Sequence, residues 1–161
     1  MTFRIGLSWT PEQLIADEDF DVSAPVGLPL VFEVCRCLEA SGATFDIAGF
    51  GRDPWPVDIP FDFELIVNQL LEAAQRVCAG DRAELNFQEQ GVEVVMAFVT
   101  ESHETSISLA VRNLGWTPTP DAEVVPHSVA CQMLTDLAGS VAEAGTHLGL
   151  SSDWLARSST G

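Results

Sequence analysis

Lysine and tyrosine are absent from this sequence, and its seven basic residues are all arginines. A nucleic-acid interface gathers basic side chains on one surface with aromatic ones between them, and seven dispersed arginines do not supply that. The 24 aspartates and glutamates bring the formal net charge to −17. Such a field repels phosphate backbones and anionic membranes and attracts basic proteins. We expect a protein partner that is basic, with no nucleic acid and no membrane. The competing explanation is an acidic surface that serves only solubility or life at high salt.

Long apolar runs are also absent, because no stretch approaches the ~18 residues that span a bilayer. The first residues do not combine basic side chains with an apolar segment, as a secretory signal would. Both observations predict a cytoplasmic protein, in which disulfides are not expected and buried thiols are the usual state of cysteine. The four cysteines are Cys35, Cys37, Cys78 and Cys131.

Spacings typical of a metal site are missing as well. Cys35 and Cys37 are separated by one residue, which is tighter than a zinc knuckle, and no second close pair follows. The three histidines, His103, His127 and His147, are scattered along the chain. We therefore expect no metal and no cofactor.

The chain does contain enough apolar material for a core. Of its 161 residues, 47% are hydrophobic and only 19% are charged, which argues against global disorder. The length fits one domain. We predict a single domain over residues 1–161, with an acidic loop at about 10–27 and a frayed tail at about 156–161.

The apolar pattern predicts three strands in the first fifty residues. Residues 3–7 alternate apolar with small or polar side chains, and residues 44–50 form a second extended run. The third strand, residues 30–38, is expected to form a hairpin with residues 44–50 through the intervening Ser-Gly turn.

The segment 30–38 is nevertheless ambiguous. Leu30, Val34 and Leu38 would share one face of a helix, whereas Leu30, Phe32 and Val34 would share one face of a strand. Its valine, phenylalanine and cysteine content favours the strand. The sequence does not decide between the two.

Two amphipathic helices follow from apolar residues at helical spacing. The first is expected to begin with Asp62 as its N-cap and to end at Gly80, a residue type that commonly follows a helix. The second begins near Pro126 and runs to about residue 148. Gly139 and Gly145 lie inside it and should weaken it by up to roughly 1 kcal/mol each relative to alanine.

Between the two helices the pattern predicts a meander of three strands. Residues 84–88, 92–98 and 107–111 each alternate apolar and polar side chains, and Gln90-Gly91 supplies a tight turn. The order of elements predicts an α+β fold, in which an antiparallel sheet of about six strands carries two long helices packed on one face. The other face of the sheet is left to water or to a partner.

Signatures of catalysis are hard to find. No serine or cysteine lies in a recognisable nucleophile motif, and His127 is better explained as a surface or capping residue. Gly49-Phe50-Gly51-Arg52 looks superficially like a phosphate cradle, but turn geometry explains it better. Pairs of carboxylates are weak evidence of a catalytic site in so acidic a chain. The sequence favours a non-enzymatic protein without excluding an enzyme.

Three short segments carry a resemblance. They are Gly49-Phe50-Gly51 with Trp55-Pro56-Val57-Asp58, Glu84-Leu85-Asn86-Phe87-Gln88-Glu89-Gln90-Gly91, and Trp116-x-Pro-x-Pro. Over roughly residues 44–148 the chain resembles small acidic bacterial proteins, some of which are similar to immunity proteins of polymorphic toxin systems. This resemblance implies a protein that acts by binding, and it brings no catalytic residues.

Our leading hypothesis is an acidic, immunity- or antitoxin-like binding protein that occludes the active site of a cognate basic toxin. One alternative is a structural or adaptor domain of a larger bacterial assembly, and another is a small hydrolase with a carboxylate-lined cleft. The predicted partner-binding residues lie on the outer strand face and in the acidic loop. They are Glu84, Asn86, Gln88, Glu89 and Glu93, together with Asp17, Glu18, Asp19 and Asp21.

Overall fold

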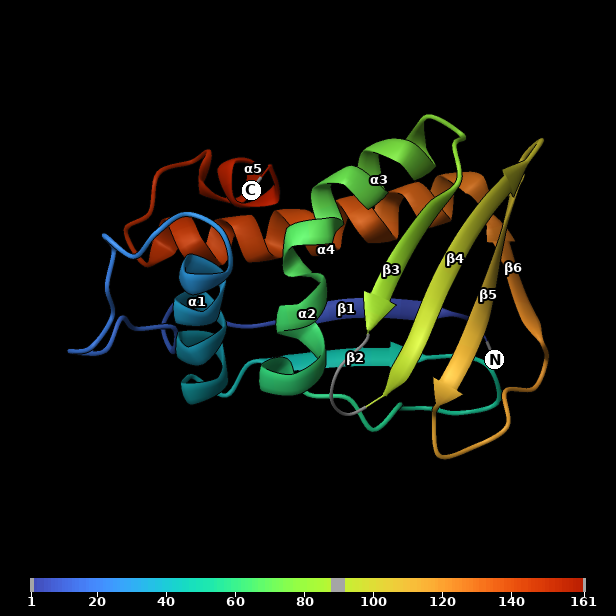
Figure 1. The fold of residues 1–161 in the computed structure, drawn as a ribbon, viewed down its shortest axis with the longest axis horizontal. Coiled ribbons are helices and arrows are strands. Elements are labelled where there is room, and N and C mark those ends of the chain that lie inside the picture. Colours follow the sequence, from blue (N-terminus) through green and yellow to red (C-terminus); the bar gives the residue numbers. More distant parts are fainter. Residues whose placement is uncertain (1, 88–91, 161) are drawn as a thin grey trace.

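The β-structure consists of two antiparallel sheets with six strands in total (Figure 1). The structure is a computed structural model that describes residues 2–87 and 92–160. In the smaller sheet, β1 (Arg4–Ser8) pairs with β2 (Thr44–Ala48). The larger sheet has the order β3-β4-β5-β6, with β3 at Ala83–Phe87, β4 at Glu93–Glu101, β5 at Glu104–Asn113 and β6 at Ala122–Pro126. The α+β class and the antiparallel pairing are confirmed, but the prediction of a single six-stranded sheet is wrong.

The alternation of side chains accounts for the larger sheet. β3 buries Leu85 and Phe87 and exposes Glu84 and Asn86, as the two-residue period of a strand requires. β3, β4 and β5 follow one another as antiparallel neighbours, which confirms the predicted meander. The turn predicted at residues 90–91 lies outside the described residues. β6 was not predicted: its five residues lie between the proline-rich segment 116–120 and the start of the last helix, where the sequence pattern indicates no strand.

The segment at residues 30–38 lies within a helix, α1 (Leu28–Ala40), so the strand prediction for it is wrong. Pro29 stands in the first turn, where its missing N–H is tolerated. Leu30, Val34 and Leu38 are buried, whereas Phe32 is 44% exposed. The residues that would share a helical face are therefore buried together, whereas one residue of the strand face is exposed. Tertiary burial of this stripe overrides the local β-propensity of valine and phenylalanine.

The first predicted helix is divided into short pieces. A π-helical turn at Ile59–Phe63 leads into α2 (Glu64–Ile66), a 3-10 turn at Val67–Gln69 and α3 (Leu70–Cys78). The N-cap is Asp58, whose carboxylate accepts the N–H of Phe61 at 2.8 Å, and not Asp62. Asp62 is buried and accepts the N–H groups of Asp58 at 2.9 Å and Val92 at 3.2 Å. Through these two hydrogen bonds, Asp62 links the π-helical turn to Val92, the residue before β4.

The last predicted helix is confirmed as α4 (His127–His147), and a short helix, α5 (Trp154–Ser159), follows it. The tail expected to fray from about residue 156 is therefore helical as far as Ser159. Trp154 is 1% exposed, and its indole N–H donates to the carbonyl of Ala142 at 3.0 Å. Gly145 lies directly beneath the indole, which holds α5 against α4.

Two of the four cysteines form a disulfide, which contradicts the expectation of reduced thiols. Cys78 ends α3, and Cys131 lies in the first turns of α4. The two helices pack side by side, which brings the Cα atoms within 4.8 Å although 53 residues separate them in the chain. Cys35 and Cys37 are free and buried, as expected. The sequence could not show the close approach on which a disulfide depends.

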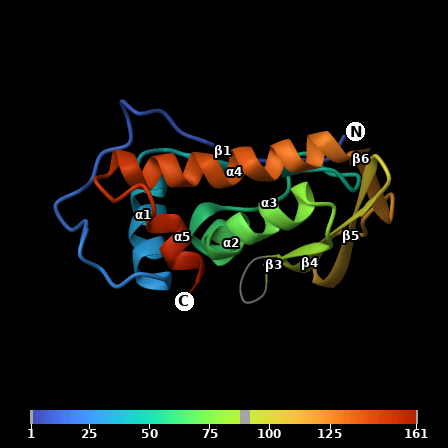
Figure 2. The same cartoon turned by 90° about the horizontal axis from the view of Figure 1, so that it is seen from above.

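The core lies between the helices and the inner faces of the two sheets (Figures 1 and 2). α4 runs along the length of the molecule and packs on α3 and β1, while α3 packs on β3. The two long helices of the chain are α1 and α4, so the expected pair of long helices on one sheet face does not form. Within the described residues, no helix has the length and apolar character to cross a membrane.

Candidate functional site: the acidic loop and helix α1

The predicted partner-binding residues do not form one surface. The acidic loop lies at one end of the long axis and the four-stranded sheet lies toward the other, with α1 and α2 between them (Figures 1 and 2). The two halves of the predicted site must therefore be assessed separately.

The strand half contains two described carboxylates, Glu84 and Glu93. Glu84 and Asn86 are exposed on β3, Glu93 is half-buried, and residues 88–89 lie outside the described residues. The carboxylate of Glu84 accepts from Arg82 at 2.7 Å. The cross-strand neighbours of these positions on β4 and β5 are small or neutral: Val95, Ala97, Ser108 and Ala110. The middle of this face is accordingly neutral.

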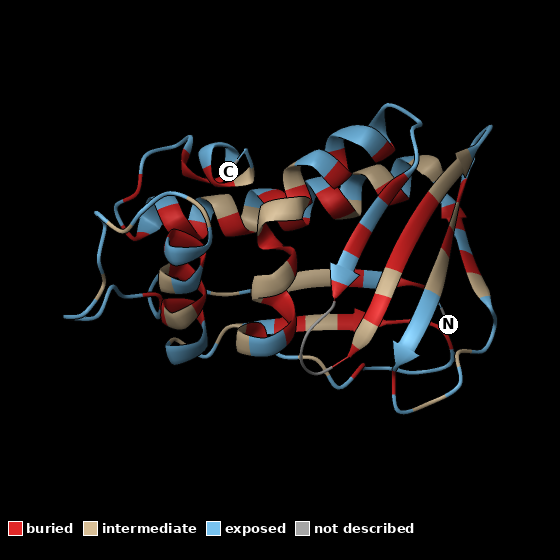
Figure 3. Ribbon diagram, viewed as in Figure 1, coloured by how far each residue is buried: buried red, intermediate tan, exposed pale blue. Residues whose placement is uncertain are grey.

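The loop half is strongly acidic and exposed. Asp17, Glu18, Asp19 and Asp21 are all exposed. The loop is drawn mostly in the colour of exposed residues (Figure 3). From residue 10 to residue 40 the sequence has seven carboxylates, and Arg36 is its one basic residue. We call the exposed residues of the loop and of α1 in this range the loop–α1 surface.

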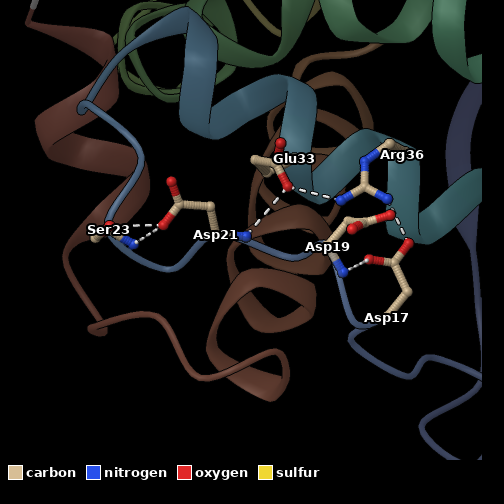
Figure 4. A network of polar contacts seen from close by, with 6 residues as sticks. All are labelled: Asp17, Asp19, Asp21, Ser23, Glu33 and Arg36. Atoms are coloured by element: carbon tan, nitrogen blue, oxygen red, sulfur yellow. Dashed lines mark hydrogen bonds and ion pairs between the residues drawn. The ribbon is translucent and has the colours of Figure 1, made fainter.

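Short-range hydrogen bonds give the loop a defined shape (Figure 4). The carboxylate of Asp17 accepts the N–H of Asp19 at 3.1 Å. That of Asp21 accepts the N–H and the hydroxyl of Ser23 at 2.9 and 2.6 Å. These hydrogen bonds lower the pKa of Asp21. Aspartate side chains commonly stabilise turns in this way, which explains why so acidic a segment is ordered.

Arg36 joins the loop to α1. Its guanidinium forms ion pairs with Glu33, one turn earlier in the helix at 2.8 Å, and with Asp17 of the loop (Figure 4). Hydrogen bonds to Glu33 and then to Asp17 raise the pKa of Arg36 further above its ordinary value. Glu33 also accepts the N–H of Asp21 at 3.3 Å. One arginine thus holds two carboxylates, and within the described residues no ion pair joins Glu12, Glu18, Asp19 or Asp21 to a basic side chain.

The N-terminal end of the loop is anchored to α4. Leu14 is 1% exposed, and its carbonyl accepts from His147 Nε2 at 2.9 Å. The indole N–H of Trp9 donates to the hydroxyl of Ser140 at 3.0 Å. Both partners belong to α4, so the acidic tip of the loop is presented from a fixed base.

Exposed apolar side chains are interleaved with the acids. Five of the nine large apolar residues that the described part of the chain leaves exposed lie here: Ile15, Val22, Val26, Leu28 and Phe32. A groove of about 490 Å³ runs between the loop and the 149–157 segment, with Val22, Leu30 and Trp154 among its lining residues. Apolar residues inside a charged rim are typical of protein-binding surfaces.

The buried carboxylates, by contrast, serve the fold. Asp62 binds two backbone N–H groups, and Glu123 accepts the N–H of Phe50 at 2.7 Å. Burial raises the pKa of Asp62. Neither lines the groove beside the loop, so the hydrolase hypothesis gains no support from them. Across residues 2–87 and 92–160, no three His, Cys, Asp or Glu side chains are placed to hold a metal ion.

The glycine-rich turn at residues 49–51 is occupied by the protein itself. The carboxylate of Glu123 takes the N–H of Phe50, which a phosphate would otherwise use. The indole N–H groups of Trp55 and Trp116 donate to the carbonyls of Gly49 at 3.1 Å and of Phe50 at 3.4 Å. Two of the three segments that carry the resemblance therefore meet in one structural cluster.

Sequence reasoning missed the apolar part of the candidate site. Leu28 and Phe32 lie one helical turn apart on the exposed face of α1, opposite the buried stripe. A helical interpretation of residues 28–40 would have revealed them as apolar residues facing solvent. Comparison of the chain with protein-family models, curated proteins and solved structures gives no significant match.

Proposed function

We propose that this chain is a non-enzymatic binding protein that docks on a basic protein through the loop–α1 surface. The observation that carries this proposal is the excess of seven carboxylates over one arginine in residues 10–40, interleaved with five exposed large apolar residues. The charge accelerates encounter with a basic partner, and the apolar side chains supply affinity once water is excluded. Because Arg36 and the aspartate turns order the loop in advance, little conformational entropy is lost on binding.

We further propose that the partner is a toxin whose active site the protein occludes, as an immunity- or antitoxin-like protein does. This step rests on the resemblance of residues 44–148 and on charge. A basic active site that binds phosphate is the complement of an acidic, pre-ordered loop. The partner's own activity should fall stoichiometrically when the two proteins are mixed.

The test begins with the partner obtained by affinity capture from the native host and released by salt. Its association rate is then measured with the wild type and with two variants of equal charge change. The first is Glu12→Lys/Glu18→Lys/Asp19→Lys in the loop, where all three side chains are exposed. The matched control reverses exposed acids of the sheet, Glu84→Lys/Glu101→Lys/Glu104→Lys.

We expect the loop variant to associate at least about 10-fold more slowly at low ionic strength, and the sheet variant to change much less. Phe32→Ala should instead speed dissociation. Equal losses in both charge variants would show that the loop is not the docking surface. Association insensitive to salt would favour the adaptor hypothesis, and a partner that stays active in the complex would refute toxin neutralisation.

A further inference from the structure

A second groove lies at the C-terminal end of α1. Its volume is about 350 Å³, and it is bounded by the C-terminal end of α1, the start of β2 and the turn at residues 57–61. The side chains that matter here are three apolar ones, Phe45, Ile59 and Phe61, and three carboxylates, Glu39, Asp46 and Asp58.

The apolar side of the groove is rigid and partly open. Phe45 and Ile59 are 4% and 3% exposed, and the ring of Phe45 lies 4.8 Å from that of Phe63 between centroids. Phe61, in contrast, is 49% exposed. Its N–H is held by the carboxylate of Asp58, so the turn that presents the ring is fixed. An exposed aromatic ring beside a buried apolar wall suits an alkyl chain.

The charge around the groove is negative. None of the residues that line it is basic. Arg4, on the strand paired with β2, donates to the carboxylate of Asp53 at 2.6 and 3.0 Å. Asp53 is the main cause of the raised pKa of Arg4, and Asp46 of the groove contributes less. The last turn of α1 carries no basic residue, so the partial negative charge of the helix C-terminus adds to that of Glu39. Nearby, burial raises the pKa of Glu64, and repulsion from Asp58 and then Glu39 raises it further.

We propose that this groove binds an arginine side chain of a partner protein. The alkyl stem lies along Phe45 and Ile59, and the guanidinium stacks on Phe61 while it donates to the surrounding carboxylates. A guanidinium fits better than an ammonium, because its planar fork can both stack on an aromatic ring and serve several acceptors. This proposal uses none of the acids of the 10–27 loop, and it shares only Glu39, near the end of α1, with the loop–α1 surface proposed above.

The groove is tested with a small probe, N-acetyl-arginine amide, titrated into the isotopically labelled full chain and followed by amide NMR. N-acetyl-citrulline amide has nearly the same shape without the charge and serves as the ligand control. We expect saturable shifts confined to residues around 43–46 and 57–61, with a dissociation constant on the order of 1–10 mM. Citrulline should give shifts several-fold smaller at the same concentration.

Variants decide whether the carboxylates are responsible. Glu39→Gln/Asp58→Asn removes two charges, while asparagine keeps the capping hydrogen bond to Phe61. We expect its affinity for the arginine probe to fall about 5- to 10-fold. Glu143→Gln, an exposed change on α4, should leave the affinity unchanged. Equal binding of citrulline, an unaffected double variant, or no localised shifts would each overturn the proposal. Because these measurements use a small probe and no basic partner protein, none of their outcomes decides whether the loop–α1 surface docks on a partner.

Discussion

The N–H of Phe50 donates a hydrogen bond of 2.7 Å to the carboxylate of Glu123, across 73 residues of chain. Glu123 belongs to the edge strand β6, and Phe50 lies in the turn after β2 with a positive φ of 55°. This bond joins the turn after the small sheet to the edge of the large one. A Cβ at Gly51 would stand 2.8 Å from the carbonyl oxygen of Thr119, so the two segments also touch directly.

Removal of the Glu123 carboxylate should destabilise the fold. Glu123→Ala leaves the buried N–H of Phe50 without an acceptor, and we expect the free energy of unfolding to fall by about 1–3 kcal/mol. Glu123→Gln retains a carbonyl oxygen that can accept this N–H, so its free energy of unfolding should fall by less. Urea unfolding measures both, with the exposed Glu104→Ala as a control expected to change within about 0.5 kcal/mol. Equal stability of the alanine variant and the wild type would mean that water replaces the carboxylate.

Two glycines of α4 should respond to alanine in opposite directions. A Cβ at Gly145 would lie 2.2 Å from the indole nitrogen of Trp154, whereas one at Gly139 would meet no atom within 4 Å. Gly145→Ala must displace α5 and should cost about 1–3 kcal/mol of stability. Gly139→Ala should add about 0.5–1 kcal/mol through helix propensity. Urea denaturation of the two variants measures these changes in stability. Equal changes in both variants would contradict the close packing of Trp154 against Gly145.

The disulfide between Cys78 and Cys131 should contribute to stability under oxidising conditions. It joins residues 53 apart, and the segment between them contains the whole larger sheet. Cys78→Ser/Cys131→Ser is expected to lower the free energy of unfolding by about 2–4 kcal/mol. The reduced wild type should match the variant, whose melting temperature should not respond to dithiothreitol. If dithiothreitol also leaves the melting temperature of the wild type unchanged, the disulfide does not stabilise the fold.

Glu64 should make stability depend on pH. Burial, then Asp58 and Glu39, raise its pKa in the folded state, so folded Glu64 keeps its proton at pH values where the unfolded chain has lost it. Its contribution to stability therefore declines as pH rises above the ordinary carboxyl pKa. Glu64→Gln should gain stability relative to the wild type between about pH 4 and 7. Denaturant unfolding at both ends of this range measures the change, with the exposed Glu72→Gln as control.

Local patterns were sufficient where one face of an element is buried and the other is not. The alternation in residues 83–87 and the helical spacing after residue 126 predict β3 and α4, because each period is a property of neighbouring residues. Residues 28–40 satisfy a helix and a strand equally well. There the choice depends on what packs against Leu30 and Val34, which neighbouring residues do not reveal.

The candidate site likewise combines features that the sequence predicts with features that only tertiary packing decides. The sequence by itself determined the acidity of residues 10–27, the absence of basic patches and the α+β antiparallel class, because composition and period are read residue by residue. Only the tertiary structure decided that the acidic loop and the larger sheet lie apart and that Phe32 is exposed. It also decided that Cys78 meets Cys131 and Phe50 meets Glu123. These relationships join residues far apart in the chain, and they arise only when helices and sheets pack around one core.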